Sequence, residues 1–190
     1  TTFNAISCDG DTSTNDMVSI FSTGYANNKV IKSYKDKNLI HFDKSLNNVL
    51  KNLAKSVAAD GEGASKFVII KVEKCKKEID AKKICFSIAN APLVKTAIAG
   101  EDANWGRVVM AIGKTEEKVI QNKLTIKFGK ILLAKNGQIN RRLRVSKVDK
   151  YMKNKLIEIE VNLKIGKNSK TVYGNDLNNE YISINADYRS

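Results

Sequence analysis

Apolar residues follow a helical spacing most clearly between about Lys44 and Ala59. They recur there at the i, i+3, i+4 and i+7 positions that are typical of an amphipathic helix. The apolar face of this predicted helix consists of Leu46, Val49, Leu50, Leu53, Ala54 and Val57. Asp43 is its natural N-cap. The D-G-E-G sequence at 60–63 is expected to end it, because two glycines allow backbone shapes that are closed to other residues.

Shorter patterns lie on both sides of this helix. A short strand is expected at 3–8, and a helix is expected at 15–23 with Gly24 as the residue that ends it. Residues 25–42 are polar and weakly patterned, which indicates a loop. Beyond the glycine turn, the apolar run at 67–72 predicts a strand.

Further helices are expected in the middle of the chain. Spaced apolar residues predict one that ends before Pro92, and these residues are Ile79, Ile84, Cys85 and Ile88. Residues 93–99 predict a short helix. Asn104 can cap another, which ends near Gly113 and carries Trp105, Val108, Val109 and Ile112 on one side. A subdivision of the chain near residues 90–115 is compatible with this order, although no Pro/Ser-rich linker marks it.

The second half of the chain turns toward β-structure. Strands are expected at 124–128 and 131–134, followed by a tight turn at Asn136-Gly137. Residues 157–165 alternate strictly between apolar and polar side chains, which indicates a strand with one buried and one solvated face. Further strands are expected at 172–173 and 181–184. The order of elements is mixed α and β.

The composition narrows the class of protein. A chain of 190 residues with 42% hydrophobic residues can bury a sizeable core. No apolar run approaches the roughly 20 residues that span a membrane, and no signal-peptide pattern opens the sequence. Three cysteines without a C-x-x-C spacing argue against a disulfide framework and a structural zinc site, which suits a reducing cytoplasm. His41 is the only histidine, which argues against a Ser-His-Asp triad or a multi-histidine metal site.

The net charge of +13 raises nucleic-acid binding as an alternative function. The lysines are scattered through every segment, however, and the run from Lys74 to Lys83 is interrupted by Glu78 and Asp80. No alternation of aromatic and basic residues matches an RNA-binding sheet. A solvated lysine surface explains the charge without nucleic acid. A basic α/β module for nucleic acid or an acidic partner stays open as the second hypothesis.

Four segments combine glycine with polar side chains beside apolar elements. They are Asp9–Asp16, Asp60–Lys66, Gly100–Arg107 and Asn185–Ser190. Glu62 is the best single candidate for chemistry, because a carboxylate between two glycines at a helix end can approach a ligand amine with little obstruction. A helix-stop turn with an exposed glutamate explains the same spacing. Packing and ion pairing are the simpler roles for Trp105 and Arg107 in the third segment.

Taken together and in this order, these segments resemble the ornithine acetyltransferase family (bifunctional glutamate N-acetyltransferase) of arginine biosynthesis. The matching stretches are T-F-N-A-I-S-C-D-G-D-T-S-T-N-D from Thr2, D-G-E-G-A-S-K from Asp60, A-N-A-P-L-V-K-T-A-I from Ala89, D-A-N-W-G-R from Asp102 and I-N-A-D-Y-R-S from Ile184. The resemblance runs through nearly the whole chain. It implies a layered α/β (α+β) sandwich of the N-terminal-nucleophile-like type with a smaller α/β region, of which this chain is the C-terminal portion.

The resemblance also implies an activity. Members of the family cleave themselves at an Ala-Thr bond, and the new N-terminal threonine accepts an acetyl group from N-acetylornithine and passes it to glutamate in a ping-pong reaction. The implied partners are N-acetylornithine, glutamate and the upstream α chain of the same precursor, in a homo-oligomer of αβ units without nucleic acid or membrane. No cofactor or metal is expected. Acetyl-CoA donates in part of the family, and the sequence leaves that donor open.

The resemblance implies that the substrate-binding residues in this sequence are Glu62, Asn185 and Ser190. The Asp9–Asp16 loop is expected to shape the site rather than to react. Thr1 is not followed by the Ala-Thr-Met-Leu type sequence of the family's cleavage site, so it is expected to be an ordinary strand-edge residue. No catalytic residue is then expected in this chain, which is predicted to be inactive alone. A third hypothesis makes Thr1 the nucleophile of an amidase-like relative.

Overall fold

A mixed β-sheet organises residues 2–188, which are the residues that the computed structural model describes. In chain order the elements are η1 (Phe3–Ala5), α1 (Leu39–Ala59), β1 (Phe67–Cys75), α2 (Glu78–Ala89), α3 (Pro92–Ala99), α4 (Trp105–Gly113), η2 (Gln121–Lys123), β2 (Thr125–Phe128), β3 (Ile131–Lys135), β4 (Gln138–Ile139), α5 (Val145–Met152), β5 (Leu156–Asn162), β6 (Asn168–Asn175) and α6 (Asn179–Asp187). This mixed order confirms the predicted α/β class.

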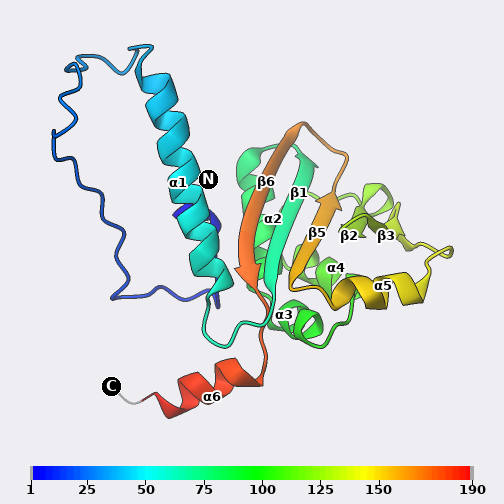
Figure 1. Ribbon diagram of the computed structural model, residues 1–190. Helices are drawn as coiled ribbons and strands as arrows, with labels where there is room; N and C mark the ends of the chain where they lie inside the picture. The colour runs from blue at the N-terminus through cyan, green and yellow to red at the C-terminus, as the bar shows by residue number, and fades with distance from the viewer. Residues whose placement is uncertain (1, 189–190) are drawn as a thin grey trace.

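The sheet has the strand order β4-β3-β2-β5-β1-β6. The central pair, β1 and β5, is parallel, with Ile70 opposite Ile159. The other pairs are antiparallel: β6 lies beside β1 with Val172 opposite Ile70, and β2 lies beside β5. Figure 1 shows α1 beside β6, and it shows α6 projecting from the end of β6.

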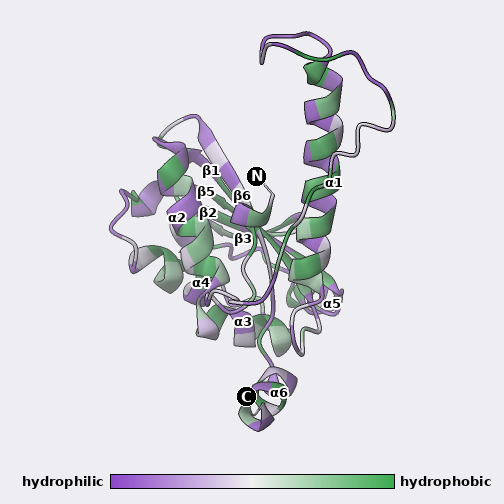
Figure 2. Cartoon of the chain, turned by 90° about the vertical axis from the view of Figure 1, so that its left-hand side faces the viewer, coloured by the Kyte–Doolittle hydropathy of each residue, from purple (hydrophilic) through white to green (hydrophobic). Residues whose placement is uncertain are grey.

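The core lies on the face of the sheet that α2 and α4 cover. Along β5 every second side chain is buried, as the predicted alternation requires, and β1 follows the same pattern as far as Val72. These side chains pack with Ile84 and Ile88 of α2 and with Val108 of α4. Figures 1 and 2 show α1 and α5 on the opposite side of the sheet. Burying each such side chain stabilises the fold by roughly 1.5–3 kcal/mol relative to leaving it exposed.

Several predicted elements are confirmed with small shifts. The turn at 60–63 ends α1, and strands or helices occur at 67–72, 93–99 and 131–134 as expected. Asn104 caps α4 by accepting a hydrogen bond from the Arg107 N–H. The turn after β3 has positive φ at both Asn136 and Gly137, as a tight hairpin turn requires.

The N-terminal quarter of the chain differs most from the prediction. The helix expected at 15–23 is wrong, because this segment is irregular and its apolar side chains are exposed. A nine-residue helix is marginal in water unless packing supports it. The strand expected at 3–8 is also wrong: the chain forms η1 and then a single bridge between Ile6 and Tyr173.

The start of α1 and the end of the chain were also predicted incorrectly. Helix α1 begins at Leu39, so Asp43 lies inside it and Asn38 takes the N-cap position without a side-chain cap. The strand expected at 181–184 is instead part of α6, because the side chain of Asn178 accepts hydrogen bonds from the backbone N–H groups of Glu180 and Tyr181. The predicted alternation through 165 also overruns β5, which ends at Asn162.

Helix α5 was not predicted. Its buried residues are Val148 and Met152, and the remainder of the helix is mostly charged or polar. The spacing of four residues between them was the available signal. It was too short to stand out among the surrounding basic residues.

Candidate active site

Three of the four glycine-flanked polar segments meet where α6 leaves the sheet. The Asn185 amide donates a hydrogen bond to the Glu62 carboxylate at 2.8 Å. The Tyr181 hydroxyl donates to the Asp9 carboxylate at 3.0 Å. The Asn178 amide donates to the carbonyl oxygen of Gly63 at 2.7 Å. Segments about 120 and 170 positions apart in the sequence therefore lie side by side.

The glycines on either side of Glu62 are needed because other parts of the chain pack against them. A Cβ atom on Gly61 would lie 2.0 Å from the Asn175 side-chain nitrogen. A Cβ atom on Gly63, which has φ +65°, would lie 2.4 Å from the backbone nitrogen of Tyr181. The α6 backbone therefore approaches the turn only because residue 63 is glycine, whereas a Cβ at residue 61 would force the buried Asn175 side chain to move. This packing leaves the Glu62 side chain exposed beside α6.

Two buried polar residues at the end of β6 hold the turn at 60–63 in place. Asp176 accepts hydrogen bonds from the backbone N–H groups of Ser65 and Lys66, each at 2.8 Å, and from the Ser65 hydroxyl at 2.5 Å. Asn175 precedes it and contacts Gly61. Because both side chains are buried and satisfied by hydrogen bonds, the segment that follows Glu62 has one well-defined position.

The ammonium group of Lys95 is buried next to the same turn. It donates hydrogen bonds to the carbonyl oxygen of Cys8 at 2.5 Å and to the carbonyl and side-chain oxygens of Asn175 at 2.6 and 2.7 Å. Burial lowers the pKa of Lys95 to about 8, and neighbouring Cys8, Asp176 and Asp9 oppose that shift. Sequence reasoning missed this residue, which lies inside the matching A-P-L-V-K-T stretch.

The loop that begins at Cys8 contributes carboxylates to the same region. Gly10 has φ +101° and packs against Asn90, whose side chain accepts a hydrogen bond from the Ser7 hydroxyl at 2.5 Å. Burial and the hydrogen bond to Asp9 raise the pKa of Tyr181, so its hydroxyl keeps the proton that it donates. From Asp9 to Asp16 the loop is exposed.

The fourth polar segment has a different role. Arg107 donates to the carbonyl oxygen of Leu93 at 2.7 Å and so joins α4 to α3. Trp105 packs partly buried against the core. Asn104 caps α4 and also donates to Asp102 at 2.9 Å. These contacts agree with the packing role expected for Trp105. Arg107, which was expected to form an ion pair, instead binds the Leu93 carbonyl and the Thr96 hydroxyl.

Two predicted residues cannot be placed. Ser190, the third substrate-binding position, and Thr1, the alternative nucleophile, both lie outside the described residues. The other two predicted positions, Glu62 and Asn185, are in direct contact.

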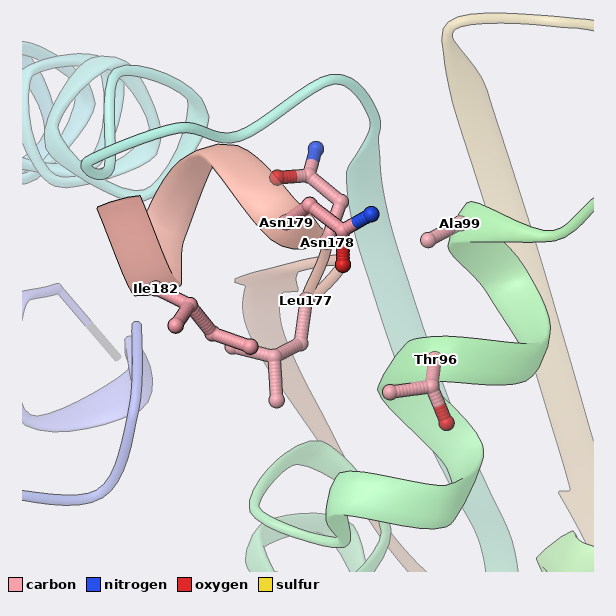
Figure 3. A pocket seen from close by; sticks show the side chains of 6 residues that line it. All are labelled: Thr96, Ala99, Leu177, Asn178, Asn179 and Ile182. Carbon is pink, nitrogen blue, oxygen red and sulfur yellow. The ribbon is translucent and has the colours of Figure 1, made fainter. Parts of the chain in front are cut away.

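A shallow hollow of about 280 Å³ lies between α3 and the start of α6 (Figure 3). Its lining consists of Thr96, Ala99, Leu177, Asn178, Asn179 and Ile182. Figure 3 shows that Thr96 and Ala99 of α3 line one side and that Leu177 and the α6 residues line the other. Neither Glu62 nor Asn185 reaches this hollow, so it is separate from the contact that joins them.

None of the helices in residues 2–188 has the length and apolar content that crossing a membrane requires. Nor do three or more His, Cys, Asp or Glu side chains gather there in a way that could hold a metal ion.

The chain is similar to a group of known proteins along its full length. The model of the ArgJ family matches residues 1–190. The protein named "Arginine biosynthesis bifunctional protein ArgJ" of Caulobacter vibrioides is 45% identical over 190 residues, which are 100% of this chain and 47% of that protein. Its namesake in Bradyrhizobium diazoefficiens is 50% identical over an alignment of 192 positions, which covers 100% of this chain and 46% of that protein.

The fold is similar as well. The crystal structure of arginine biosynthesis bifunctional protein ArgJ from Bacillus halodurans has a TM-score of 0.92 and 37% identity, over 98% of this chain and 87% of that one. The chain spans about half the length of the curated relatives that it matches. These comparisons do not support the alternative of a nucleic-acid-binding module.

Proposed function

Because this chain belongs to the ArgJ family, we propose that it is the C-terminal part of a cytoplasmic acetyltransferase of arginine biosynthesis. The proposed reaction transfers an acetyl group from N2-acetylornithine to glutamate. It proceeds in two steps through an acetyl ester on a threonine that an upstream segment of the precursor supplies. This chain contributes substrate-binding residues and is inactive alone.

The contact between Glu62 and Asn185 is the observation that carries the proposal. The exposed Glu62 carboxylate can bind the ammonium group of an amino-acid substrate by a charge-assisted hydrogen bond. The Asn185 amide holds that carboxylate in place and offers its own oxygen to the substrate. Ser190 follows five positions later, and we propose that its hydroxyl completes the set.

Exposed apolar side chains support an upstream partner. Helix α1 buries only Ala54 and Ala58, although its apolar face is much longer. The segment before it exposes further large apolar side chains, which are Met17, Val18, Ile20, Phe21, Tyr25, Val30, Ile31 and Tyr34. Apolar surface of this extent marks an interface in soluble proteins. We propose that the upstream α chain covers it and that the resulting αβ units associate into a homo-oligomer.

Reconstitution tests the proposed reaction. The chain is produced together with an upstream half that carries the nucleophilic threonine, and acetyl exchange between N-acetylornithine and glutamate is measured. We expect exchange from the mixture, none from this chain alone, and none when that threonine is replaced by alanine. A folded, associated mixture without exchange would count against the assignment. Acetyl-CoA in place of N-acetylornithine tests the second donor.

The role of Glu62 has a matched control. Glu62→Gln removes the charge but keeps the side-chain shape, so we expect KM for N-acetylornithine to rise by roughly 10–100-fold, since a hydrogen bond to a charged group contributes about 1.5–3 kcal/mol. Glu180→Gln changes another exposed glutamate, in the first turn of α6, and should leave KM unchanged. Equal effects of the two substitutions would contradict the proposed role.

A further inference from the structure

Lys95 occupies an unusual position, because its buried ammonium joins two segments that both end at the proposed site. Its side chain is 3% exposed. One hydrogen bond reaches Cys8, directly before Asp9, and two reach Asn175, which supports the Gly61 side of the turn that carries Glu62. The Lys95 carbonyl oxygen also accepts a hydrogen bond from the Leu177 N–H, at 3.4 Å, just before α6.

We propose that Lys95 is a positioning residue that sets the relative placement of Asp9, Glu62 and α6 without touching the substrate. The proposal rests in part on the function proposed above, since it assumes that Glu62 binds substrate. Its geometric basis is independent of that function. It requires only that the Cys8 and Asn175 segments share one ammonium group.

A lysine that served packing alone would be a costly choice at this position. None of its three hydrogen-bond acceptors is a carboxylate, so no direct ion pair within residues 2–188 offsets the desolvation of the ammonium. An apolar side chain of similar length would fill the volume without burying a charge. What it could not provide is a common donor for oxygens from two distant segments.

The number of acceptors indicates which protonation state is needed. An ammonium has three N–H groups for the three oxygens around it, whereas a neutral amine has two N–H groups and a lone pair that would face an oxygen. Loss of the proton therefore leaves one of the three oxygens without a donor. The charged and titratable groups that face Lys95 are Cys8 and Asp9 on one side and Asp176 on the other, and both carboxylates favour the ammonium.

Hydrogen–deuterium exchange on the chain itself tests the positioning role. Lys95→Met should speed exchange at least tenfold at the amides of Ser7 and Ala64, which lie on the two joined segments and are hydrogen-bonded in the native chain. Lys66→Met is the matched control: it removes another buried lysine, one that donates to the carbonyl oxygens of Met152 and Asn154. Lys66→Met should speed hydrogen–deuterium exchange at the Asn154 amide instead. Equal effects of both variants at Ser7 and Ala64 would overturn the proposal.

The wild-type chain provides a measurement that does not depend on a variant folding. Opening of either segment exposes Lys95, which then regains its ordinary pKa and takes up a proton. Exchange rates at Ser7 and Ala64, corrected for the intrinsic effect of pH, should therefore fall as the pH rises above about 8. The corrected rate at Asn154 should stay constant. Identical pH dependence at all three amides would show that the ammonium does not hold the two segments.

The reconstituted enzyme supplies the functional readout. Lys95→Met should raise KM at least tenfold for both substrates and change kcat less than threefold, since it displaces groups that bind substrate rather than the nucleophile. The ratio of the wild-type KM to the variant KM should change as the pH passes about 8, because only the wild type carries the Lys95 proton. A loss of kcat with unchanged KM and an unchanged pH profile would overturn the positioning role. If the wild-type mixture shows no exchange activity, the proposed function fails, and the amide-exchange measurements still decide the role of Lys95.

Discussion

The sheet core and residues 11–53, here called the N-terminal arm, contain the same kinds of apolar side chain in very different surroundings. Ile70 and Ile159 in the core are each 1% exposed, whereas Phe21 in the arm is 86% exposed. No residue of the arm is buried. Figure 1 shows that the coil before α1 forms a wide loop that extends away from the sheet. The core therefore holds itself together, and the arm gains little from its own apolar residues.

This difference separates what the chain does alone from what it does in the proposed assembly. Hydrophobic stabilisation requires that apolar area be removed from water, so exposed residues of the arm contribute to folding only when something covers them. Substitutions in the core, in the arm and at their border should therefore differ strongly in their effect on stability.

Ile159→Ala in the core and Val49→Ala in the arm give the largest contrast. Loss of the buried Ile159 side chain should lower the free energy of unfolding by about 3 kcal/mol, as is typical of large-to-small core substitutions. Val49 is 55% exposed, and its replacement should change that free energy by less than about 0.5 kcal/mol. Urea unfolding of the isolated chain measures both.

Measuring Ile159→Ala and Val49→Ala again with the upstream half present sharpens the comparison. If a partner covers α1, Val49→Ala should then weaken association although it leaves the isolated chain unaffected. A Val49 substitution that destabilises the isolated chain as much as Ile159→Ala would mean that the arm is part of the core after all.

Gly63→Ala and Gly24→Ala compare two glycines with similar backbone angles. Gly63 has φ +65° and Gly24 has φ +69°, so alanine is strained at both. A Cβ atom on Gly63 would meet the α6 backbone, whereas a Cβ atom on Gly24 would meet nothing within 4 Å. We expect Gly63→Ala to lower the free energy of unfolding by about 2 kcal/mol and Gly24→Ala by less than about 1 kcal/mol. Equal costs in thermal unfolding would show that backbone strain alone decides both.

The sequence predicted the core better than the arm for a physical reason. Alternation at 157–165 and the spacing of Ile84 and Ile88 reflect burial that occurs within this chain. The apolar residues of 15–23 have the same character but no local partner, so their spacing did not produce a helix. The spacing of apolar residues indicates which side chains avoid water. It does not indicate whether this chain or another molecule covers them.

For the candidate site, motif order predicted more than spacing did. Glu62 was named from its two flanking glycines and again from a matching stretch, whereas Asn185 was named from a matching stretch alone. The two residues lie in contact. Lys95 was not found, because a lysine within an apolar helical stretch has the sequence pattern of an ordinary surface residue. Its role follows only from three oxygens that come from distant parts of the chain. Long-range hydrogen bonds of this kind leave no local periodicity.

The pH dependence of stability distinguishes the buried Lys95 from exposed lysines of the arm. Burial lowers its pKa from 10.5 to about 8, so between these values the unfolded chain binds more protons than the folded chain. The penalty of burying the ammonium is present below pH 8 and is relieved as pH rises. Relative to Lys95→Met, the wild-type free energy of unfolding should therefore increase by about 1.5 kcal/mol between pH 8 and pH 9.5.

An arm lysine provides the control for this titration. Lys51 lies in the exposed part of α1. A Lys51→Met variant should parallel the wild type across the same range in urea unfolding. If the difference in free energy of unfolding between wild type and Lys95→Met stayed constant with pH, Lys95 would have its ordinary pKa. Its surroundings would then be as solvent-exposed as those of the arm lysines.

Helix α6 is attached to the sheet less firmly than the core strands but more firmly than the arm. A double-mutant cycle can measure the strength of that attachment. The helix buries no residue, and the hydrogen bond from Tyr181 to Asp9 is one of its few links to the body of the chain. Both side chains are solvent-accessible, so Tyr181→Phe and Asp9→Ala should couple by only about 0.5 kcal/mol in urea unfolding. A coupling near 2 kcal/mol would make α6 as firmly attached as the core. Near-zero coupling would mean that α6, like the arm, depends on a partner for its position.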